Sequence, residues 1–433
     1  MSSKMPAHAT KEEANAALVP QLRFPEFRKA WVPKTLETLG YFTGGGTPSK
    51  ENEAYWAGDI PWISSSDLIE DSISQIRINR FITKQAVQES ATKLVPAKSI
   101  LLISRVGVGK LAVSALPLCT SQDFTNFTPT AADPLFLAYL LKSRKQTLLS
   151  FNQGTSIKGF TKDNIATLEL GFPTPEEQQK IAECLSSVDE LIAAQARKLD
   201  ALKTHKKGLM QQLFPREGET QPRLRFPEFQ NAGEWETKRV DERGNVLAGK
   251  ALAVNAPGPL RPYLRTKNVL DGAIDLSDVL TMPMTDAEFS RFEILDGDIL
   301  LNEGQSLGLV GRASIYRGEF GQRCAMQNAL LRFRAFPSTC PEFAAQAFRQ
   351  CQKDGTFASI ATQTTSVAHL GSSRFGALLL AWPPTLAEQQ RIADCLSSLD
   401  DLIAAQIQTL EALKTHKHGL MQQLFPSPEE AMA

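Results

Sequence analysis

The sequence has few of the features that mark secreted, membrane-bound or disulfide-rich proteins. Its six cysteines show no Cys-x-x-Cys spacing, so we expect buried thiols in a reducing compartment instead of disulfides or zinc ligands. The longest apolar runs, such as residues 135–141 and 377–382, are much shorter than the roughly 20 residues that cross a bilayer. The first twenty residues contain no continuous apolar segment of a secretory signal. We therefore expect a cytoplasmic protein without a membrane span.

Net charge is also lacking, because 47 lysine and arginine residues balance 47 aspartate and glutamate residues. This balance excludes a polycation that holds nucleic acid by charge alone, although it is compatible with a local basic face. Motifs of metal and nucleotide chemistry are missing as well. The VGVGK segment at residues 106–110 lacks the first glycine and the Ser or Thr of a P-loop, and the five histidines form no HExxH pair. We expect no metal site in this chain.

The sequence does contain an internal repeat. LRFPEF occurs at residues 22–27 and again at residues 224–229. Residues 173–215 align with residues 384–426, with 32 identities in 43 positions, and both copies end in GLMQQLFP. Between these landmarks lie two middles of low mutual similarity. Duplication followed by divergence of the middles explains this pattern, and it indicates that the ends share one task while the middles have two different ones.

Each copy of residues 173–215 carries a heptad seam that predicts a long helix, beginning after a proline and ending at Phe-Pro. We expect the seam to form a helix-helix and partner interface. In the first copy its positions are Ile181, Leu185, Val188, Ile192, Gln195, Leu199 and Leu202. In the second copy they are Ile392, Leu396, Leu399, Ile403, Gln406, Leu410 and Leu413.

Two lysines decide how these helices are expected to pack. In a parallel, in-register pair Lys206 would face Lys417, whereas antiparallel packing sets each lysine opposite an apolar layer along which its stem can lie. The sequence therefore predicts a pseudo-two-fold molecule in which an antiparallel two-helix bar holds the middles apart. The alternative is two separate amphipathic helices, each covering its own domain.

The middles mix short β-type runs with Gly-rich turns and a few helical patterns, which is typical of small α+β domains. The polar loop from Gly44 to Lys50 has backbone amides and a lysine that suit phosphates, although a surface turn explains it about as well.

Together these segments resemble the specificity subunits of Type I restriction-modification systems. GGGTPSKENEAYWAGDIPWISSSDL at residues 44–68 looks like that family's recognition-domain opening. PTPEEQQKIAECLSSVDELI at residues 173–192 and the two GLMQQLF endings look like its helical regions. The resemblance covers essentially the whole chain after about Leu22.

The resemblance implies an α+β fold with two tandem α/β target-recognition domains separated by two long helices. The expected segments are a flexible tail (1–21), recognition domain 1 (22–172), spacer helix 1 (173–215), a linker with recognition domain 2 (216–383), spacer helix 2 (384–426) and a C-terminal tail (427–433).

The resemblance also implies a non-catalytic DNA reader. Each recognition domain would read one half of a split target in the major groove, while the helices set the spacer and dock partner subunits. The expected partners are double-stranded DNA, two modification subunits that methylate adenine, and two restriction subunits. S-adenosylmethionine, ATP and magnesium would belong to those partners, with no cofactor in this chain, and the compartment would be the cytoplasm of a bacterium or archaeon.

The family pattern assigns candidate DNA-binding residues by position. In the first domain they are Gly46, Thr47, Ser49, Lys50, Ser64, Ser65, Ser66, Arg105 and Lys110. In the second they are Lys250, Tyr263, Arg265, Thr266, Lys267, Asn268, Arg312, Gln327 and Asn328. Arginine and lysine suit guanine, asparagine and glutamine suit adenine, and any single residue could equally contact phosphate or be a solvated loop residue. Gln122-Asp123-Phe124 departs from the Gly-Phe of many relatives, so the conformation of this turn is not predicted.

Two other classes of function remain as alternatives. A coiled-coil adaptor whose middles bind proteins would show no salt-sensitive affinity for DNA, whereas a DNA reader weakens steeply with salt. A fused methyltransferase would need a cofactor pocket and a catalytic tetrapeptide, and Trp382-Pro383-Pro384 lacks the residues around the prolines that grip a flipped adenine.

Overall fold

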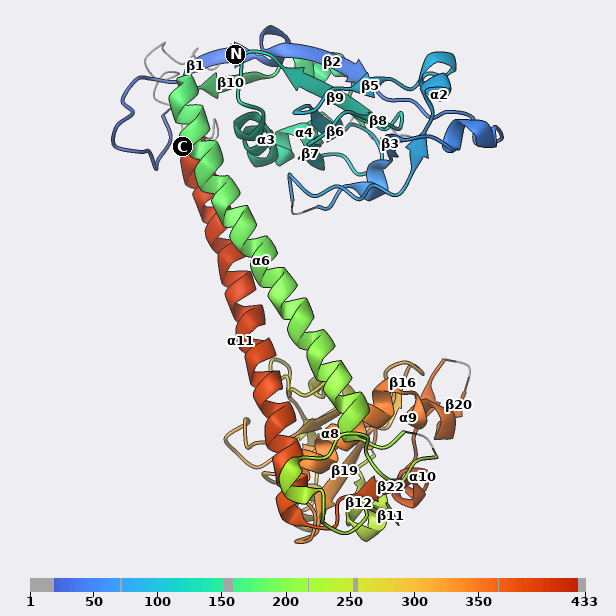
Figure 1. Ribbon diagram of the computed structural model, residues 1–433. Coiled ribbons are helices and arrows are strands. Elements are labelled where there is room, and N and C mark those ends of the chain that lie inside the picture. The colour runs from blue at the N-terminus through green and yellow to red at the C-terminus, as the bar shows by residue number, and fades with distance from the viewer. Residues whose placement is uncertain are drawn as a thin grey trace, which may run out of the picture. The chain divides into compact units, whose positions relative to one another are not determined.

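The computed structural model describes residues 19–70, 72–151, 159–216, 218–251, 256–364 and 366–426. The tail predicted at residues 1–21 lies outside the described residues up to residue 18, and the tail predicted at 427–433 lies wholly outside them. The chain divides into two compact units (Figure 1). Unit 1 combines the residues up to Arg197 with those from Gln408 onward, and unit 2 runs from Lys198 to Ile407.

Unit 1 is an α+β domain built on two four-stranded sheets, with strand orders β2-β9-β6-β7 and β4-β3-β8-β5, and a β1-β10 pair. Its strands are β1 (Val32–Thr35), β2 (Gly40–Gly44), β3 (Ile60–Ile63), β4 (Phe81–Ile82), β5 (Leu94–Val95), β6 (Ile100–Ile103), β7 (Leu111–Val113), β8 (Leu118–Thr120), β9 (Phe124–Pro129) and β10 (Glu169–Phe172). Its short helices are η1 (Leu36–Thr38), η2 (Glu53–Trp56), η3 (Ser65–Asp67), α2 (Lys84–Glu89), α3 (Pro134–Ser143), α4 (Lys145–Ser150) and α5 (Lys162–Ala166).

Unit 2 repeats this plan, with sheets ordered β12-β19-β15-β17 and β14-β13-β18, a β11-β22 pair, and a further sheet β16-β21-β20. Its strands are β11 (Glu236–Arg239), β12 (Gly244–Ala248), β13 (Leu260–Leu264), β14 (Leu280–Pro283), β15 (Ile299–Asn302), β16 (Gly304–Gln305), β17 (Ala313–Ile315), β18 (Ala325–Met326), β19 (Leu330–Ala335), β20 (Thr362–Gln363), β21 (Ala368–His369) and β22 (Leu379–Trp382). Its short helices are η4 (Pro227–Phe229), η5 (Val240–Glu242), η6 (Thr266–Asn268), α7 (Asp286–Phe292), α8 (Pro341–Lys353), α9 (Thr356–Ile360) and α10 (Ser372–Ala377).

The two units share one topology. In unit 1, β3 pairs parallel with β8, and β9 pairs antiparallel with both β2 and β6. In unit 2, β13 pairs parallel with β18, and β19 pairs antiparallel with both β12 and β15. The predicted α+β class, with two tandem domains and two long helices, is confirmed.

The central strand of each unit is apolar without alternation because both of its faces are buried. In β6, Ile100 and Leu102 enter the core against α3, while Leu101 and Ile103 enter the core shared with the second sheet. All four residues of this strand are buried. A strand covered on both faces reads as a continuous apolar run instead of an alternating one.

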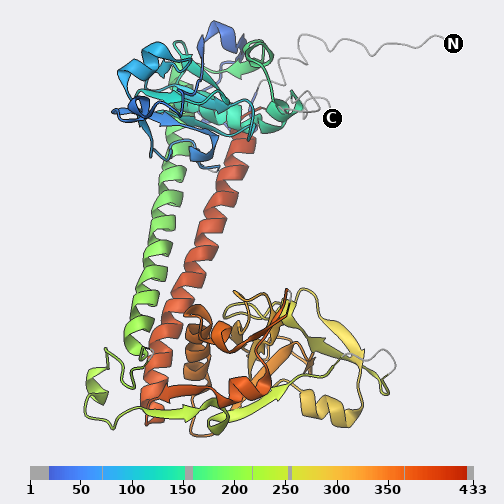
Figure 2. The same cartoon turned by 90° about the vertical axis from the view of Figure 1, so that its right-hand side faces the viewer.

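The long helices α6 (Pro175–Leu213) and α11 (Leu386–Leu424) each contain 39 residues. In unit 1, Ile181 and Leu185 near the start of α6 share a core with Leu424 near the end of α11. In unit 2, Leu213 at the end of α6 shares a core with Ile392 near the start of α11. In each unit, therefore, the start of one long helix packs beside the end of the other (Figure 2), which confirms the antiparallel prediction.

The two buried lysines of the seam have carboxylate partners. In unit 2, Lys206 of α6 pairs with Asp400 of α11, and in unit 1, Lys417 of α11 pairs with Asp189 of α6. The lysine side chains are only 6% and 8% exposed. The aspartate partners were not predicted from the sequence, although a buried ammonium group needs a counter-charge.

A buried glutamate at the start of each long helix holds the LRFPEF lead. Arg23 donates to both carboxylate oxygens of Glu177 at 2.8 Å, and the Trp31 indole donates to it as well. Leu22 N donates to the carbonyl of Gln423 near the end of α11, at 3.0 Å. The lead thus clips the start of one long helix to the end of the other.

Unit 2 repeats the clip with the second LRFPEF. Arg225 donates to both oxygens of Glu388 at 2.7 Å, the Trp235 indole donates at 3.0 Å, and Leu224 N donates to the carbonyl of Gln212 at 2.9 Å. This shared contact set explains why Leu, Arg and the following Trp recur in both halves of the sequence.

In the part of the chain that the structure describes, no helix combines the length and the apolar character needed to span a bilayer.

Replacing Lys417 with methionine should lower the free energy of unfolding by about 3 kcal/mol. The Asp189 side chain is only 15% exposed. Its carboxylate would then keep the hydrogen bond from the Tyr139 hydroxyl at 2.7 Å but lose the ammonium group of Lys417. Urea unfolding of the full chain at pH 7 measures the change.

Lys206→Met is the matched control, and it should lower the free energy of unfolding by less than about 1 kcal/mol. The loss is small because the Asp400 carboxylate stays neutralised by other partners. Asp400 would retain the Arg349 guanidinium at 2.8 Å and the Gln346 amide at 3.0 Å. Equal losses for the two variants would contradict this account of the pairs.

Stability should also depend on pH through Lys206. Burial, together with the nearby Arg349 guanidinium, lowers the pKa of Lys206 to about 8, against an ordinary 10.5. Between these values the unfolded chain binds more protons than the folded chain. The free energy of unfolding should therefore rise with pH in this window, by at most about 1.4 kcal/mol per pH unit from this group. Unfolding at pH 7.5, 8.5 and 9.5 should show this rise in the wild type relative to Lys206→Met, and parallel curves would refute it.

Candidate nucleic-acid interface

Three loops of unit 1 converge on the turn between β8 and β9. Phe124 N donates to the carbonyl of Ser121 at 3.2 Å and closes this turn, so the Gln122-Asp123 departure does not prevent it. Three neighbouring loops bond to the turn: Ser121 N donates to Ile63 O at the end of β3 (2.9 Å), Ser104 N after β6 donates to Asp123 O (2.8 Å), and Gly46 N after β2 donates to Thr120 O (2.8 Å). We call this set the loop cluster of unit 1.

Unit 2 builds the same loop cluster on the turn between β18 and β19. The equivalent bonds run from Gln327 N to Leu264 O (2.9 Å), from Glu303 N to Ala329 O (2.9 Å), and from Lys250 N to Met326 O (3.0 Å). The backbone framework is therefore repeated, and the side chains that it carries differ.

Glycine is required where the loop after β2 passes this turn. A Cβ on Gly45 would lie 1.9 Å from the carbonyl oxygen of Ser121, and one on Gly249 would lie 2.2 Å from that of Gln327. Because any side chain would collide with backbone, the loop approaches the turn this closely only with glycine at these positions.

In unit 1 a polar group lies at the end of β3. The Ser64 hydroxyl and backbone amide both donate to Asp67, at 3.0 and 2.7 Å, and Arg80 donates to Ser64 at 2.7 Å and pairs with Asp67. The Arg80 guanidinium lies 4.7 Å from the centre of the Trp62 ring. Arg80 was missed in the sequence, because only folding brings it, from the position just before β4, to the loop after β3.

Lys110 does not stand alone after β6. It pairs with Glu70 at 3.2 Å, and Lys145 pairs with the same carboxylate at 3.2 Å. Hydrogen bonds from these two lysines lower the pKa of Glu70. The carboxylate therefore stays ionised at neutral pH and holds both ammonium groups at the surface.

In unit 2 the loop after β13, which corresponds to the loop after β3 in unit 1, carries positively charged side chains. Arg265 and Lys267 share Asp278, at 2.5 and 2.7 Å. The hydrogen bond from Lys267 is the largest cause that lowers the pKa of Asp278. In the loop after β12, Lys250 pairs with Glu288. These carboxylates preorganise the cations and would compete with an incoming anion.

The structure distributes the predicted DNA-binding side chains over three levels of exposure. Exposed are Ser49, Lys50, Ser66, Arg105, Lys267 and Asn328. Half-buried are Thr47, Ser64, Ser65, Lys110, Lys250, Arg265, Thr266, Arg312 and Gln327. Buried are Gly46, Tyr263 and Asn268.

The three buried positions are corrections to the predicted site. Tyr263 is 4% exposed and packs in the core beside Phe289. Asn268 is 1% exposed, and its amide donates to two backbone carbonyls while its carbonyl accepts from Arg265 N at 3.0 Å. A Cβ on Gly46 would lie 2.4 Å from the backbone of Ala91. These buried residues shape the loops.

Gln122 is a further member of the cluster that the sequence analysis did not select. Its side-chain carbonyl accepts from the Thr47 hydroxyl at 2.5 Å, and the residue is exposed. Gln122 belongs to the Gln122-Asp123-Phe124 turn, which departs from the Gly-Phe of many relatives. That departure was the sequence signal that could have selected it.

The predicted seam positions lie as follows. Buried are Ile181, Leu185, Val188, Ile392, Leu396, Gln406 and Leu410. Half-buried are Ile192, Gln195, Leu199, Leu202, Leu399, Ile403 and Leu413. Outside the seam, the repeat-equivalent Leu191 and Leu402 are 54% and 55% exposed.

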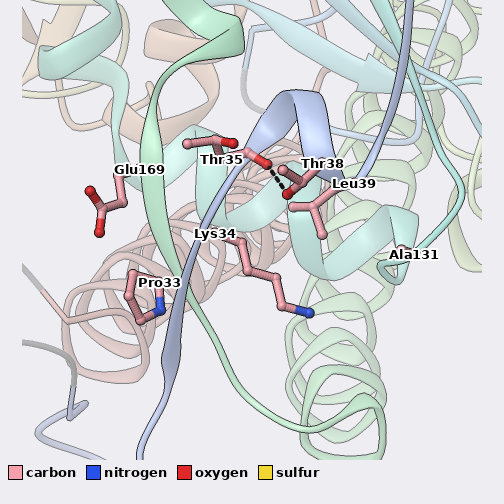
Figure 3. Close-up of a pocket in the computed structure, with 7 residues that line it drawn as sticks. All are labelled: Pro33, Lys34, Thr35, Thr38, Leu39, Ala131 and Glu169. Carbon is pink, nitrogen blue, oxygen red and sulfur yellow. Dashed lines mark hydrogen bonds between the residues drawn. The ribbon is translucent and has the colours of Figure 1, made fainter.

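A surface hollow of about 530 Å³ lies in unit 1 away from the loop cluster (Figure 3). It is lined by Pro33, Lys34, Thr35, Thr38, Leu39, Ala131 and Glu169. Its polar lining consists of one lysine, one glutamate and two threonines. Among the residues with described positions, no three His, Cys, Asp or Glu side chains gather as metal ligands would.

Comparisons with known proteins agree with this geometry. A family model described as Type I restriction modification DNA specificity domain matches residues 28–204. The chain is 31% identical over 277 residues to the Type I restriction enzyme MjaIX specificity subunit of Methanocaldococcus jannaschii, covering 58% of this chain and 61% of that protein. It is 33% identical over 178 residues to a Type I restriction enzyme specificity subunit of Escherichia coli, covering 39% and 43%. The chain thus spans less than two thirds of the length of these curated relatives.

A solved structure extends the similarity of fold to nearly the whole chain. The S subunit of a Type I restriction-modification system from M. genitalium matches with a TM-score of 0.61 at 15% identity, covering 94% of this chain and 99% of that one. With the repeated loop cluster and the paired long helices, these matches show that the chain is similar to the specificity subunits of Type I restriction-modification systems.

Proposed function

We propose that this chain is the non-catalytic DNA-reading subunit of a Type I restriction-modification complex. Each loop cluster reads one half of a split DNA target, and the long helices set the spacer between the halves and dock the methyltransferase subunits. The complex would hold two modification and two restriction subunits in the cytoplasm of its host. S-adenosylmethionine, ATP and magnesium would bind to those partners.

The observation that carries the proposal is one backbone framework bearing two different sets of side chains. Where η3 of unit 1 begins, the chain presents Ser64, Ser65 and Ser66, and where η6 of unit 2 begins, it presents Arg265 and Lys267 around a threonine. Hydroxyls bond to several bases, whereas arginine and lysine favour the O6 and N7 acceptors of guanine. Two such surfaces suit two unlike half-sites.

The ion pairs of the clusters support a reader and not a charge-only binder. Because Lys110, Lys250, Arg265 and Lys267 all have carboxylate partners, non-specific attraction to phosphate is partly cancelled. A base or phosphate that replaces a carboxylate must meet the cation with good geometry. This requirement favours the right sequence over a wrong one.

The long helices supply two similar surfaces for one kind of partner. Their segments share 32 of 43 residues, and the exposed Leu191 of α6 has its equivalent in the exposed Leu402 of α11. Apolar side chains exposed at equivalent positions of a repeat favour two copies of the same partner. This supports the docking of two methyltransferase subunits.

The proposal is tested by mapping adenine methylation in cells that carry this chain and its modification subunit, with and without the gene for this chain. We expect a split motif with an unspecific spacer that disappears on deletion. Unchanged methylation in an otherwise active system would favour an adaptor without DNA specificity.

Lengthening both helices tests their role in setting the spacer. Four residues inserted after Gln195 and four after Gln406 add about 6 Å of helix, which corresponds to about two base pairs of DNA. The spacer of the methylated motif should lengthen by about that number while the half-sites stay the same. Four residues inserted after Arg216, outside the helices, are the control and should leave the motif unchanged. An unaltered spacer in the helix variant would contradict the role.

A further inference from the structure

The loop cluster of unit 2 continues into a hairpin of β20 and β21. The three-stranded sheet has the order β16-β21-β20, and Gly304 and Gln305 of β16 pair with His369 and Ala368 of β21. Strand β16 begins one residue after Glu303, the residue that bonds to the central turn. The hairpin is therefore joined through β16 to a residue that bonds to the turn between β18 and β19 (Figure 1).

The residue that follows the hairpin in unit 2 and its counterpart in unit 1 form the same backbone hydrogen bond. In unit 2, Leu370 N donates to Glu303 O at 2.9 Å. In unit 1, Phe160 N donates to Ser104 O at 3.0 Å, and Ser104 is the residue that bonds to the central turn there. Leu370 and Phe160 are both buried, at 0% and 5% exposure. Phe160 and Leu370 thus follow one plan.

The sequence of the segment is repeated as well. Residues 363–367 read QTTSV and residues 153–157 read QGTSI, each three residues before the buried Leu370 or Phe160. The middles otherwise resemble each other only faintly. Side chains shared by two readers of different half-sites suit the part of DNA that does not vary with sequence, which is the phosphate backbone.

The chemistry of the hairpin suits phosphate. Thr362, Gln363 and Ser366 are exposed and carry hydrogen-bond donors without negative charge. Arg374, exposed at the base of the hairpin, donates to the carbonyls of His369 at 2.7 Å and Leu370 at 3.1 Å.

A carboxylate next to β21 is already engaged. Glu303 Oε2 lies 3.0 Å from His369 Nδ1, and the Glu303 side chain is 18% exposed. The hairpin therefore offers amide, hydroxyl and guanidinium donors to an anion.

We infer that the β20–β21 hairpin of unit 2 grips the DNA phosphate backbone through Gln363 and Ser366, with Arg374 beside them, and thereby positions the loop cluster without reading bases. This inference rests on the proposed function. It assigns to the hairpin a role in affinity and register, whereas the loops after β13, β15 and β18 would carry the sequence preference.

The test uses the full chain in complex with its modification subunit and two DNA duplexes of equal length, one with the methylated motif and one with it scrambled. Gln363→Ala combined with Ser366→Ala should weaken binding to both duplexes by a similar factor of about ten. The motif mapped in cells should not change. Gln363→Lys should strengthen binding and steepen the dependence of log Kd on log salt by about 1, because a new cation releases a further counterion.

Gln230→Ala combined with Ser338→Ala is the matched control, since both residues are exposed in unit 2 away from the cluster, and it should leave both affinities unchanged. A motif altered in one half-site by the Gln363 and Ser366 changes would overturn the inference in favour of base reading. Unchanged affinities for both duplexes would also overturn it. If the wild-type complex does not prefer the motif duplex, the proposed function itself fails, a result distinct from either of these.

Discussion

A buried glutamate at the start of each long helix is the constraint on which the rest of the structure depends. Glu177 and Glu388 are 1% and 0% exposed, and an ionised carboxylate at such depth is costly unless charged and hydrogen-bonded partners surround it. The LRFPEF leads supply an arginine, and the following tryptophans supply an indole N–H. Since each lead also bonds to the end of the other long helix, the clip joins the first residues of a unit to both helices. The reciprocal Lys–Asp pairs extend the same pairing further along the helices.

On this support each unit carries a rigid loop framework with variable side chains. The turn between β8 and β9, or between β18 and β19, forms backbone hydrogen bonds with three other loops, and none of these bonds depends on side-chain identity except where glycine permits close approach. Side chains on the framework can therefore change without loss of the fold. A scaffold of this kind suits a protein that needs two different recognition surfaces, because specificity can diverge while the backbone stays the same.

Charged side chains in the loop clusters are paired with neighbours of opposite charge, in keeping with the zero net charge of the chain. Asp278 serves both Arg265 and Lys267, and Glu70 serves both Lys110 and Lys145, so cations are held in position and partly screened before any partner arrives. The β20–β21 hairpin contrasts with these loops, because its exposed donors are mostly neutral and recur in sequence in the other half. The proposed division of labour, with paired cations for sequence and shared neutral donors for the backbone, follows from that contrast.

The sequence by itself determined the repeat, the two long helices, their antiparallel packing and the α+β class, because heptad spacing, proline stops and duplicated landmarks are local signals along the chain. It did not identify the aspartates that meet Lys206 and Lys417, the arginine before β4 that reaches Ser64, or the burial of Tyr263 and Asn268. Those depend on which residues distant in sequence are brought together. Only the tertiary structure decided them, since the parallel β3-β8 and β13-β18 pairings and the convergence of three loops on one turn are formed by non-local hydrogen bonds.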